Sequence, residues 1–171
     1  RMAGDLNAAV SDAHETIRLI ETDLSMGKVK AEALRSIGIC LDKQGKSAEA
    51  LEWFNQALAI SASIKDKENV AIIQLGLGVV YENLGNYSQS MNMYQSALDH
   101  WHQLENSIWL PNVLNNLGVL QHLTGNYKAA ISSYEKALQY AHRSKYARIE
   151  AFILTGIADI YMELNAIDEA L

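Results

Sequence analysis

With 171 residues, of which 49% are apolar and 20% charged, the chain has the composition of a folded protein and not of a disordered tail. The net charge of −6, without a block of like charges, argues against nucleic acid as a partner, because phosphate binding needs a concentrated basic face. No apolar run reaches the length of about 18 residues that a membrane span needs, and a single cysteine without a visible signal peptide predicts a cytoplasmic location.

Apolar residues recur along the whole chain at offsets of three, four and seven, which is typical of amphipathic helices. One such series is Leu77, Val80, Tyr81 and Leu84. No alternating β-branched run bounded by turns predicts a strand, and Pro111 falls where the first turn of a helix tolerates it. Helices are predicted near residues 5–23, 28–44, 47–64, 67–84, 87–104, 108–124, 127–143 and 146–164, and another is expected to begin near 167.

Small residues recur at a spacing of 40 residues. The first column is Gly38, Gly78, Gly118 and Ala158, and a second column follows it seven residues later. A fixed period of this length indicates one supersecondary unit stacked several times, here a pair of amphipathic helices. Such an architecture favours a binding surface over an active site. The later columns are Gly45, Gly85, Gly125 and Asn165; Ala50, Ser90, Ala130 and Ala170; Phe54, Tyr94 and Tyr134; and Ala57, Ala97 and Ala137.

The second column predicts how each helix pair turns. Gly85 and Gly125 are suited to the left-handed backbone conformation that ends a first helix, and Asn165 is the next best residue for it. Asn86 and Asn126 then stand where they could cap the second helix. The small residues of the first column let neighbouring helices approach closely, and the aromatic column fills the space between units.

These columns resemble the tetratricopeptide repeat family. The resemblance covers nearly the whole chain and implies an all-α fold, an α-solenoid of about eight helices in antiparallel pairs that form a right-handed superhelix. The period of 40 resembles the longer repeats of signalling scaffolds, kinesin light chains and MalT-type bacterial transcriptional activators, and residues 115–120 read much like the bacterial set. The residues that carry the resemblance best are Leu77, Gly78, Tyr81, Gly85, Tyr87, Ser90, Tyr94, Ala97 and Leu98, with Leu117, Gly118, Gly125, Tyr127, Ala130, Tyr134, Ala137 and Leu138 one period later.

The repeat register divides the chain into one array over residues 1–171. It comprises a partial repeat at 1–26, complete repeats near 27–66, 67–106 and 107–146, and a partial repeat at 147–171. Because the array opens and stops half-way through a repeat and begins with Arg1, we expect a fragment of a longer protein.

In the family, the first helix of each unit lines a concave face, and the resemblance places a partner-binding groove there. Ile39, Val79 and Val119 form an apolar row in it, which is either an exposed binding strip or a row buried by a tight superhelix. A clamp for a terminal carboxylate is not expected, because only Arg35 and Asn116 match its positions. The candidate groove residues are Arg35, Ile39, Ile72, Leu75, Val79, Glu82, Asn112, Asn115, Asn116, Val119, His122, Phe152 and Asp159.

No residues are assigned to catalysis, to a cofactor or to a metal. Residues 43–47 echo the end of a phosphate-binding loop, but Cys40 stands where that loop needs glycine, and a helix precedes it. Cys40 shares a column with apolar residues and is predicted to be a buried thiol. Trp101 and Trp109 flank the loop between two units, either as a binding hot spot or as a seal between repeats.

The leading hypothesis is therefore a non-enzymatic module that binds a protein or peptide in its groove, as the repeat segment of a bacterial signalling or transcription regulator. Two alternatives stay open. The superhelix could enclose a small inducer and shift a switch, which a deep enclosed pocket would favour. Alternatively, apolar faces at the two ends could let chains associate end to end.

Overall fold

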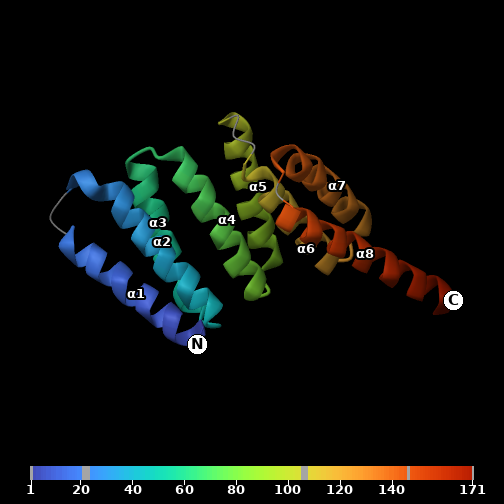
Figure 1. Ribbon diagram of the computed structural model, residues 1–171, viewed down its shortest axis with the longest axis horizontal. Coiled ribbons are helices and arrows are strands. Elements are labelled where there is room, and N and C mark those ends of the chain that lie inside the picture. Colours follow the sequence, from blue (N-terminus) through green and yellow to red (C-terminus); the bar gives the residue numbers. More distant parts are fainter. Residues whose placement is uncertain (1, 21–23, 105–107, 146, 171) are drawn as a thin grey trace. The chain divides into compact units, whose positions relative to one another are not determined.

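The fold is built from helices throughout the described residues, which are 2–20, 24–104, 108–145 and 147–170 of a computed structural model (Figure 1). No β-strand occurs in these ranges, and the predicted all-α fold of paired helices is confirmed. Within the same ranges, no helix is both long and apolar enough to cross a membrane. The helices are α1 (Met2–Leu19), α2 (Gly27–Lys43), α3 (Ser47–Ser63), α4 (Lys67–Asn83), α5 (Tyr87–Gln103), α6 (Leu110–Leu123), α7 (Tyr127–Ser144) and α8 (Ala147–Ala170), with a short 3-10 helix, η1, at Leu24–Met26.

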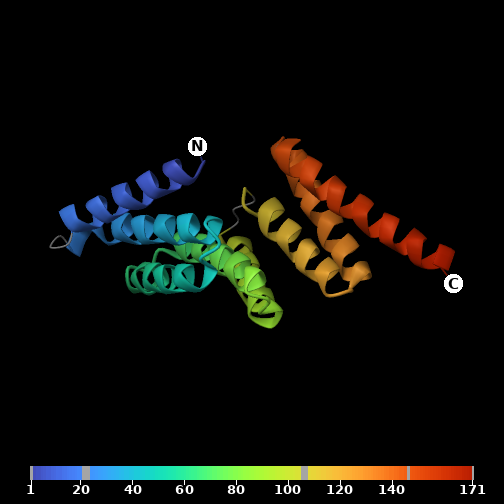
Figure 2. The ribbon, with the colours of Figure 1, turned by 90° about the horizontal axis from the view of Figure 1, so that it is seen from below.

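The chain forms two compact units, residues 1–100 and 101–171. In unit 1, α2 packs against α1 and α3, and α3 also packs against α4 (Figure 2). In unit 2, α7 packs against α6 and α8, and α6 also contacts α8. The second helices α3 and α7 therefore each lie between their own first helix and the first helix of the next repeat. That both units belong to one continuous array stays a prediction.

The predicted glycine turns are confirmed. Gly45, Gly85 and Gly125 have φ values of +78°, +74° and +76°, a left-handed conformation that glycine adopts without a Cβ penalty. In the first of these turns the Gly45 amide donates to Asp42 O at 2.9 Å and the Lys46 amide to Leu41 O at 2.9 Å. This pair of bonds satisfies the last carbonyl groups of α2 and reverses the chain within three residues.

In the turns between repeats, a lysine and not a glycine adopts the left-handed conformation. Lys65 after α3 and Lys145 after α7 have φ values of 59° and 55°. The next helix, α4, is capped by Asp66, whose Oδ1 accepts the Asn69 amide at 3.1 Å. The predicted cap of α7 is confirmed, since Asn126 Oδ1 accepts the Ala129 amide at 3.4 Å.

The repeat core is an aromatic ring held between two glycines. Phe54 of α3 contacts Gly38 on α2 and Gly76 on α4, and a Cβ at either glycine would fall within 3.0 Å of its ring. Tyr134 of α7 lies in the same way between Gly118 on α6 and Gly156 on α8. The small column therefore has the packing role that its spacing predicts. Cys40 is a buried free thiol, as predicted.

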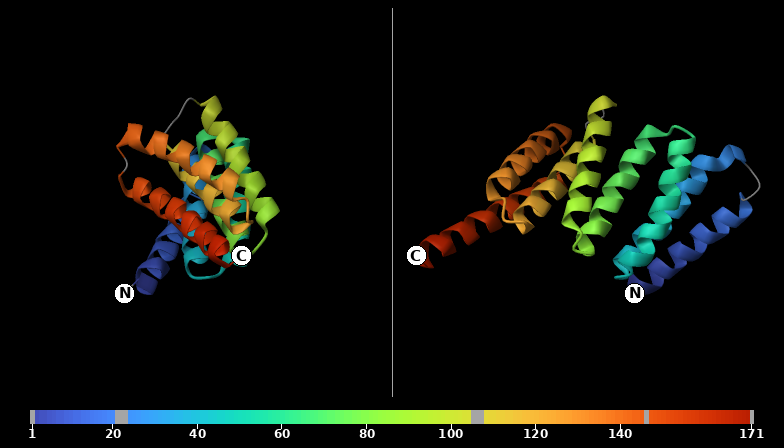
Figure 3. Two further views of the ribbon diagram at one scale, coloured as in Figure 1. Left: turned by 90° about the vertical axis from the view of Figure 1, so that its right-hand side faces the viewer. Right: turned by 180° about the vertical axis from the view of Figure 1, so that it is seen from behind.

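The prediction for the last repeat is wrong. A turn was expected at Asn165 with a new helix from about 167, yet α8 runs without interruption from Ala147 to Ala170 (Figure 3). Asparagine lacks the freedom of glycine in the left-handed region, whereas continuing the helix adds a backbone hydrogen bond with each residue. The first predicted helix also ends earlier, at Leu19, and residues 21–23 of that prediction lie outside the described residues.

Candidate functional site

The predicted groove residues divide between the two units. Unit 1 carries Arg35 and Ile39 on α2, and Ile72, Leu75, Val79 and Glu82 on α4. Unit 2 carries Asn112, Asn115, Asn116, Val119 and His122 on α6, and Phe152 and Asp159 on α8.

In unit 2 the structure brings six of these residues together along the line where α6 meets α8. One cleft of about 250 Å³ is lined by Asn115, Val119, His122, Phe152 and Asp159, along with Leu123, Tyr134, Thr155 and Gly156. A second cleft of about 220 Å³ is lined by Asn112, Arg148, Ile149 and Phe152. Because Phe152 lines both clefts, they form one surface feature, which we name the α6/α8 groove.

Helical spacing explains why these side chains share one groove. Asn112, Asn115, Val119 and His122 follow one another at steps of three, four and three, which places them on one face of α6. Phe152 and Asp159 are seven residues apart, two turns along the same face of α8. Gly156 stands between them and lets α8 approach the Tyr134 ring closely, with its backbone forming part of the floor.

Phe152 is the apolar centre of the groove. Its side chain is 57% exposed, which is unusual for a large apolar residue at a helix contact. The Arg148 guanidinium lies 5.9 Å from its ring centroid, in the range of a cation–π contact. Val119, on the opposite wall, is half-buried. The groove therefore offers an aromatic face and an aliphatic wall to an incoming apolar side chain.

Polar groups line the two ends of the groove. At one end, Asn115 Nδ2 donates to Asn116 Oδ1 at 3.4 Å, a local contact for Asn116. At the other end, His122 Nε2 lies 3.1 Å from Glu163 Oε2 on α8. The Tyr127 ring lies 5.7 Å from the His122 ring, and loss of hydration, followed by the nearby Glu163 carboxylate, raises the Tyr127 pKa. The trio of His122, Tyr127 and Glu163 joins α6, α7 and α8 at this end.

The six candidates in unit 1 are all half-buried. Ile39 packs against the core around Phe54. Glu82 accepts a hydrogen bond from the Tyr94 hydroxyl at 3.0 Å, and burial, partly offset by this bond, raises its pKa above the ordinary 4.5. Burial lowers the pKa of Arg35, partly offset by Glu32, and Arg35 Nε has no hydrogen-bond partner. That the apolar row of unit 1 binds a partner stays a prediction.

Sequence reasoning missed Arg148 and the role of Glu163. The sequence alone carried no signal for the pairing of Glu163 with His122, but the structure shows a parallel: a pair of residues 41 positions apart also joins two first helices in unit 1. There, Asn83 Nδ2 donates to both Asp42 carboxylate oxygens at 3.1 Å. The pair His122 and Glu163 occupies the same two repeat positions. Arg148 belongs to no repeated column, so the repeat pattern carried no signal for it.

Two other features were singled out from the sequence. The Trp101 ring is fully buried and stacks on Trp109, with centroids 6.0 Å apart and planes at 15°. This geometry favours the packing interpretation of the pair over a binding hot spot. No group of three metal-ligating side chains occurs in the part of the chain that the structure describes.

Comparisons with known proteins identify the repeat. Two family models described as tetratricopeptide repeat match residues 69–143 and 31–62, together more than half of the chain. No curated protein sequence matches.

The chain also resembles solved structures. The structure of BtubC (BKLC) from P. vanneervenii has a TM-score of 0.75 at 22% identity, covering 98% of this chain and 72% of that one. The apo form of RapI has a TM-score of 0.82 at 16% identity, covering 95% of this chain and 63% of that one. At these identities the likeness shows the fold alone. The chain spans only part of both proteins, and the resemblance to MalT-type activators stays a prediction.

Proposed function

Since the chain belongs to the tetratricopeptide repeat family, whose repeats are protein-interaction modules, we propose that its α6/α8 groove binds an extended peptide segment of a partner protein. The observation that carries this proposal is the convergence of six family groove positions on one groove around the exposed Phe152. The module is non-enzymatic in this proposal.

The groove chemistry indicates the class of segment. An apolar side chain of the ligand fits against Phe152 and Val119, where burial removes apolar surface from water on both sides. The carboxamides of Asn112 and Asn115 offer donors and acceptors to the ligand backbone. Asp159 places a carboxylate in the groove, which favours a basic side chain next to the apolar anchor. The predicted ligand is thus an extended segment with an apolar residue close to Lys or Arg.

The size of the groove favours a peptide over an enclosed small molecule. Its two clefts measure about 250 and 220 Å³ and open to solvent, whereas small-molecule sites usually enclose roughly 300–1,000 Å³. We further propose that the chain itself is part of a bacterial signalling or transcription regulator, which rests on the resemblance of residues 115–120 to MalT-type repeats.

Selection from a phage-displayed random peptide library tests the proposal. The chain should select peptides with an apolar residue near Lys or Arg, with binding measured by fluorescence anisotropy of the synthesised peptide. Phe152→Ala should weaken binding at least about tenfold, and Asp159→Asn should weaken it for basic peptides only. Tyr161→Ala, an equally exposed aromatic on another face of α8, is the matched control. Selection of no peptide, or equal binding by Phe152→Ala, would contradict the proposal.

A further inference from the structure

Arg148 and Asp159 place charges of opposite sign on either side of Phe152 in the α6/α8 groove. Arg148 lines one of the two clefts and Asp159 the other, while Phe152 lines both. The three residues follow one another at offsets of four and seven, so they lie along one face of α8. Within the described part of the chain, neither charged group has an ion-pair partner. Both charges are therefore available to a ligand.

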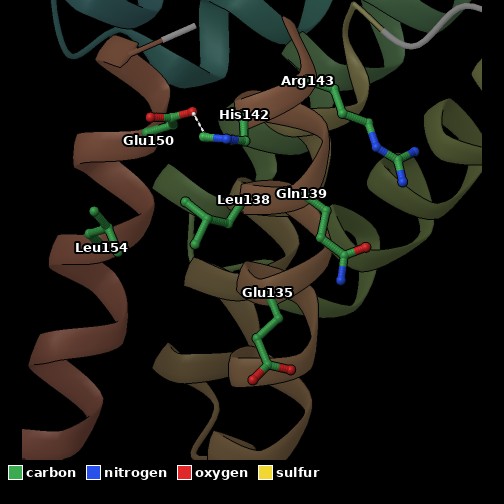
Figure 4. A pocket seen from close by; sticks show the side chains of 7 residues that line it. All are labelled: Glu135, Leu138, Gln139, His142, Arg143, Glu150 and Leu154. Atoms are coloured by element: carbon green, nitrogen blue, oxygen red, sulfur yellow. Dashed lines mark ion pairs between the residues drawn. The ribbon is translucent and has the colours of Figure 1, made fainter. Parts of the chain in front are cut away.

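The other carboxylates near the groove are engaged by histidines. Glu150 is two residues from Arg148 and lies on another side of α8, where His142 Nδ1 of α7 is 3.4 Å from Glu150 Oε1 (Figure 4). Glu163 lies at the far end of the groove, and its Oε2 is 3.1 Å from His122 Nε2. Neither of these carboxylates is held against the Arg148 guanidinium, which therefore stays the positive end of the groove.

The opposite wall of the groove is uncharged between these two ends. There α6 contributes Asn112, Asn115 and Val119, which are two carboxamides and an aliphatic side chain. The charge pattern of the groove is thus set by α8, with a positive group in its first turn and a negative group about three turns later. A ligand with charges of one sign only would meet attraction at one end of the groove and repulsion at the other.

Helix geometry converts these positions into a spacing for the ligand. At a rise of about 1.5 Å per residue, Phe152 lies about 6 Å from Arg148 along the axis of α8, and Asp159 lies about 10 Å beyond Phe152. An extended peptide advances by about 3.3 Å per residue, so these intervals correspond to about two and about three ligand residues. The Arg148 guanidinium also lies 5.9 Å from the centroid of the Phe152 ring, so an anion bound to it would adjoin the apolar centre of the groove.

We propose that the α6/α8 groove binds an extended peptide in which an acidic and a basic residue flank the apolar one, and the apolar residue is nearer to the acidic one. This inference rests on the proposed function and adds to it a second charged subsite and a fixed register. The Arg148 guanidinium binds the ligand carboxylate through its paired N–H donors, Phe152 contacts the apolar side chain, and Asp159 binds the ligand cation. The two charged residues of the ligand are about five positions apart.

Four capped synthetic peptides of identical composition test this register. Two of them place leucine nearer to the acidic residue: Asp-Ser-Leu-Ser-Ser-Lys and its reverse, Lys-Ser-Ser-Leu-Ser-Asp. The other two place it nearer to the basic residue: Lys-Ser-Leu-Ser-Ser-Asp and Asp-Ser-Ser-Leu-Ser-Lys. Binding is measured by titration of the backbone amide chemical shifts of the 171-residue chain. The better peptide of the first pair should bind about fivefold more tightly than either peptide of the second pair.

Exchange of the two charges on the protein should reverse this preference. The double variant Arg148→Glu/Asp159→Lys should bind one of the second pair best, because the negative group now lies close to Phe152. Arg148 is exposed in the first turn of α8, where glutamate is favourable, so this variant should keep the helical circular dichroism of the parent chain. Arg143→Glu, at an exposed position of α7 outside the groove (Figure 4), is the matched control and should leave the order of the four peptides unchanged.

The outcomes separate this inference from the proposed function. Equal binding of all four peptides that is lost in Phe152→Ala overturns the charge register and leaves the groove as a peptide site. An order of affinities that is the same in the parent chain and in Arg148→Glu/Asp159→Lys overturns it as well. Four peptides that all fail to bind also overturn the inference, and the proposed function fails with it only if the phage-displayed library yields no Phe152-dependent peptide.

Discussion

The ring of Tyr134 lies so close to Gly118 that a Cβ added at this glycine would fall 2.6 Å from the ring. Tyr134 is 1% exposed and belongs to α7, whereas Gly118 belongs to α6, so this contact sets how closely the two helices of the repeat approach. The same ring is contacted from its other side by Gly156 of α8. The ring therefore has little room to move away from a new methyl group.

Gly118→Ala should destabilise unit 2. In an ordinary helix interior this change stabilises by about 0.5–1 kcal/mol, but here overpacking against the ring should outweigh that gain and lower the free energy of unfolding by about 1–3 kcal/mol. Urea unfolding followed by circular dichroism measures the change. In a Tyr134→Ala background the same substitution should become neutral or stabilising. An equal loss in both backgrounds would show that the ring is not the cause.

Glu82→Gln should stabilise unit 1 at neutral pH. Burial raises the pKa of Glu82, partly offset by the hydrogen bond from Tyr94, so the native state binds more protons than the unfolded state between the two pKa values. The favourable contribution of protonated Glu82 to the free energy of unfolding is therefore present at low pH. It is lost as the pH rises through the folded-state pKa of Glu82. Glutamine keeps an acceptor for the Tyr94 hydroxyl and removes the charge. The Tm of the Glu82→Gln variant should exceed that of the parent chain at neutral pH, and the difference between the two Tm values should shrink below pH 4.5.

Glu52→Gln, at an exposed position on α3, is the control for Glu82→Gln. Its effect on Tm should be small at every pH, because an exposed carboxylate keeps its hydration. A Tm difference for Glu82→Gln that is constant with pH would mean that the substitution acts through packing and not through the charge of Glu82.

The helix pairs could be predicted because their determinants are local. Gly45, Gly85 and Gly125 end helices through their own backbone freedom, and the aromatic column needs small neighbours at fixed spacing. The groove position of Phe152 followed from the family register. The 57% exposure of the Phe152 side chain did not follow from that register, because exposure depends on which side chains of α6 and α8 pack beside it.

Two features could not be predicted because they depend on a competition between alternatives. At Asn165 the choice between a turn and a continued helix rests on a small difference in backbone free energy, which the repeat pattern alone does not reveal. The pairing of His122 with Glu163 depends on how two first helices align, and neither residue type recurs in its column. Repeat spacing therefore predicts well where a residue lies in the fold, but it predicts poorly which other side chain that residue contacts.

Lys65→Gly should stabilise unit 1. Lys65 has a φ of 59°, in the left-handed region that costs a residue with a Cβ roughly 1 kcal/mol, and glycine removes that penalty. The larger conformational freedom of glycine in the unfolded chain offsets part of the gain, which leaves about 0.5 kcal/mol. The urea midpoint should rise at an unchanged m-value. Lys67→Gly, two residues later at the first position of α4, should lower it, because glycine there loses more backbone freedom on folding than lysine and gains nothing from a helical φ. A lower midpoint for both variants would contradict the strain at Lys65.

Asn165→Gly should end α8 before residue 166 and restore the turn that the other repeats have. At the three equivalent positions glycine has a φ between +74° and +78°, whereas inside a helix it costs about 1 kcal/mol relative to alanine. The substitution thus favours the turn and disfavours the continuous helix at the same residue. Backbone chemical shifts should show loss of the helical conformation at residue 165 alone, with Asn165→Ala retaining it as the control. Helical shifts that persist through residue 165 in the glycine variant would mean that side-chain packing, and not the backbone preference of asparagine, keeps α8 continuous.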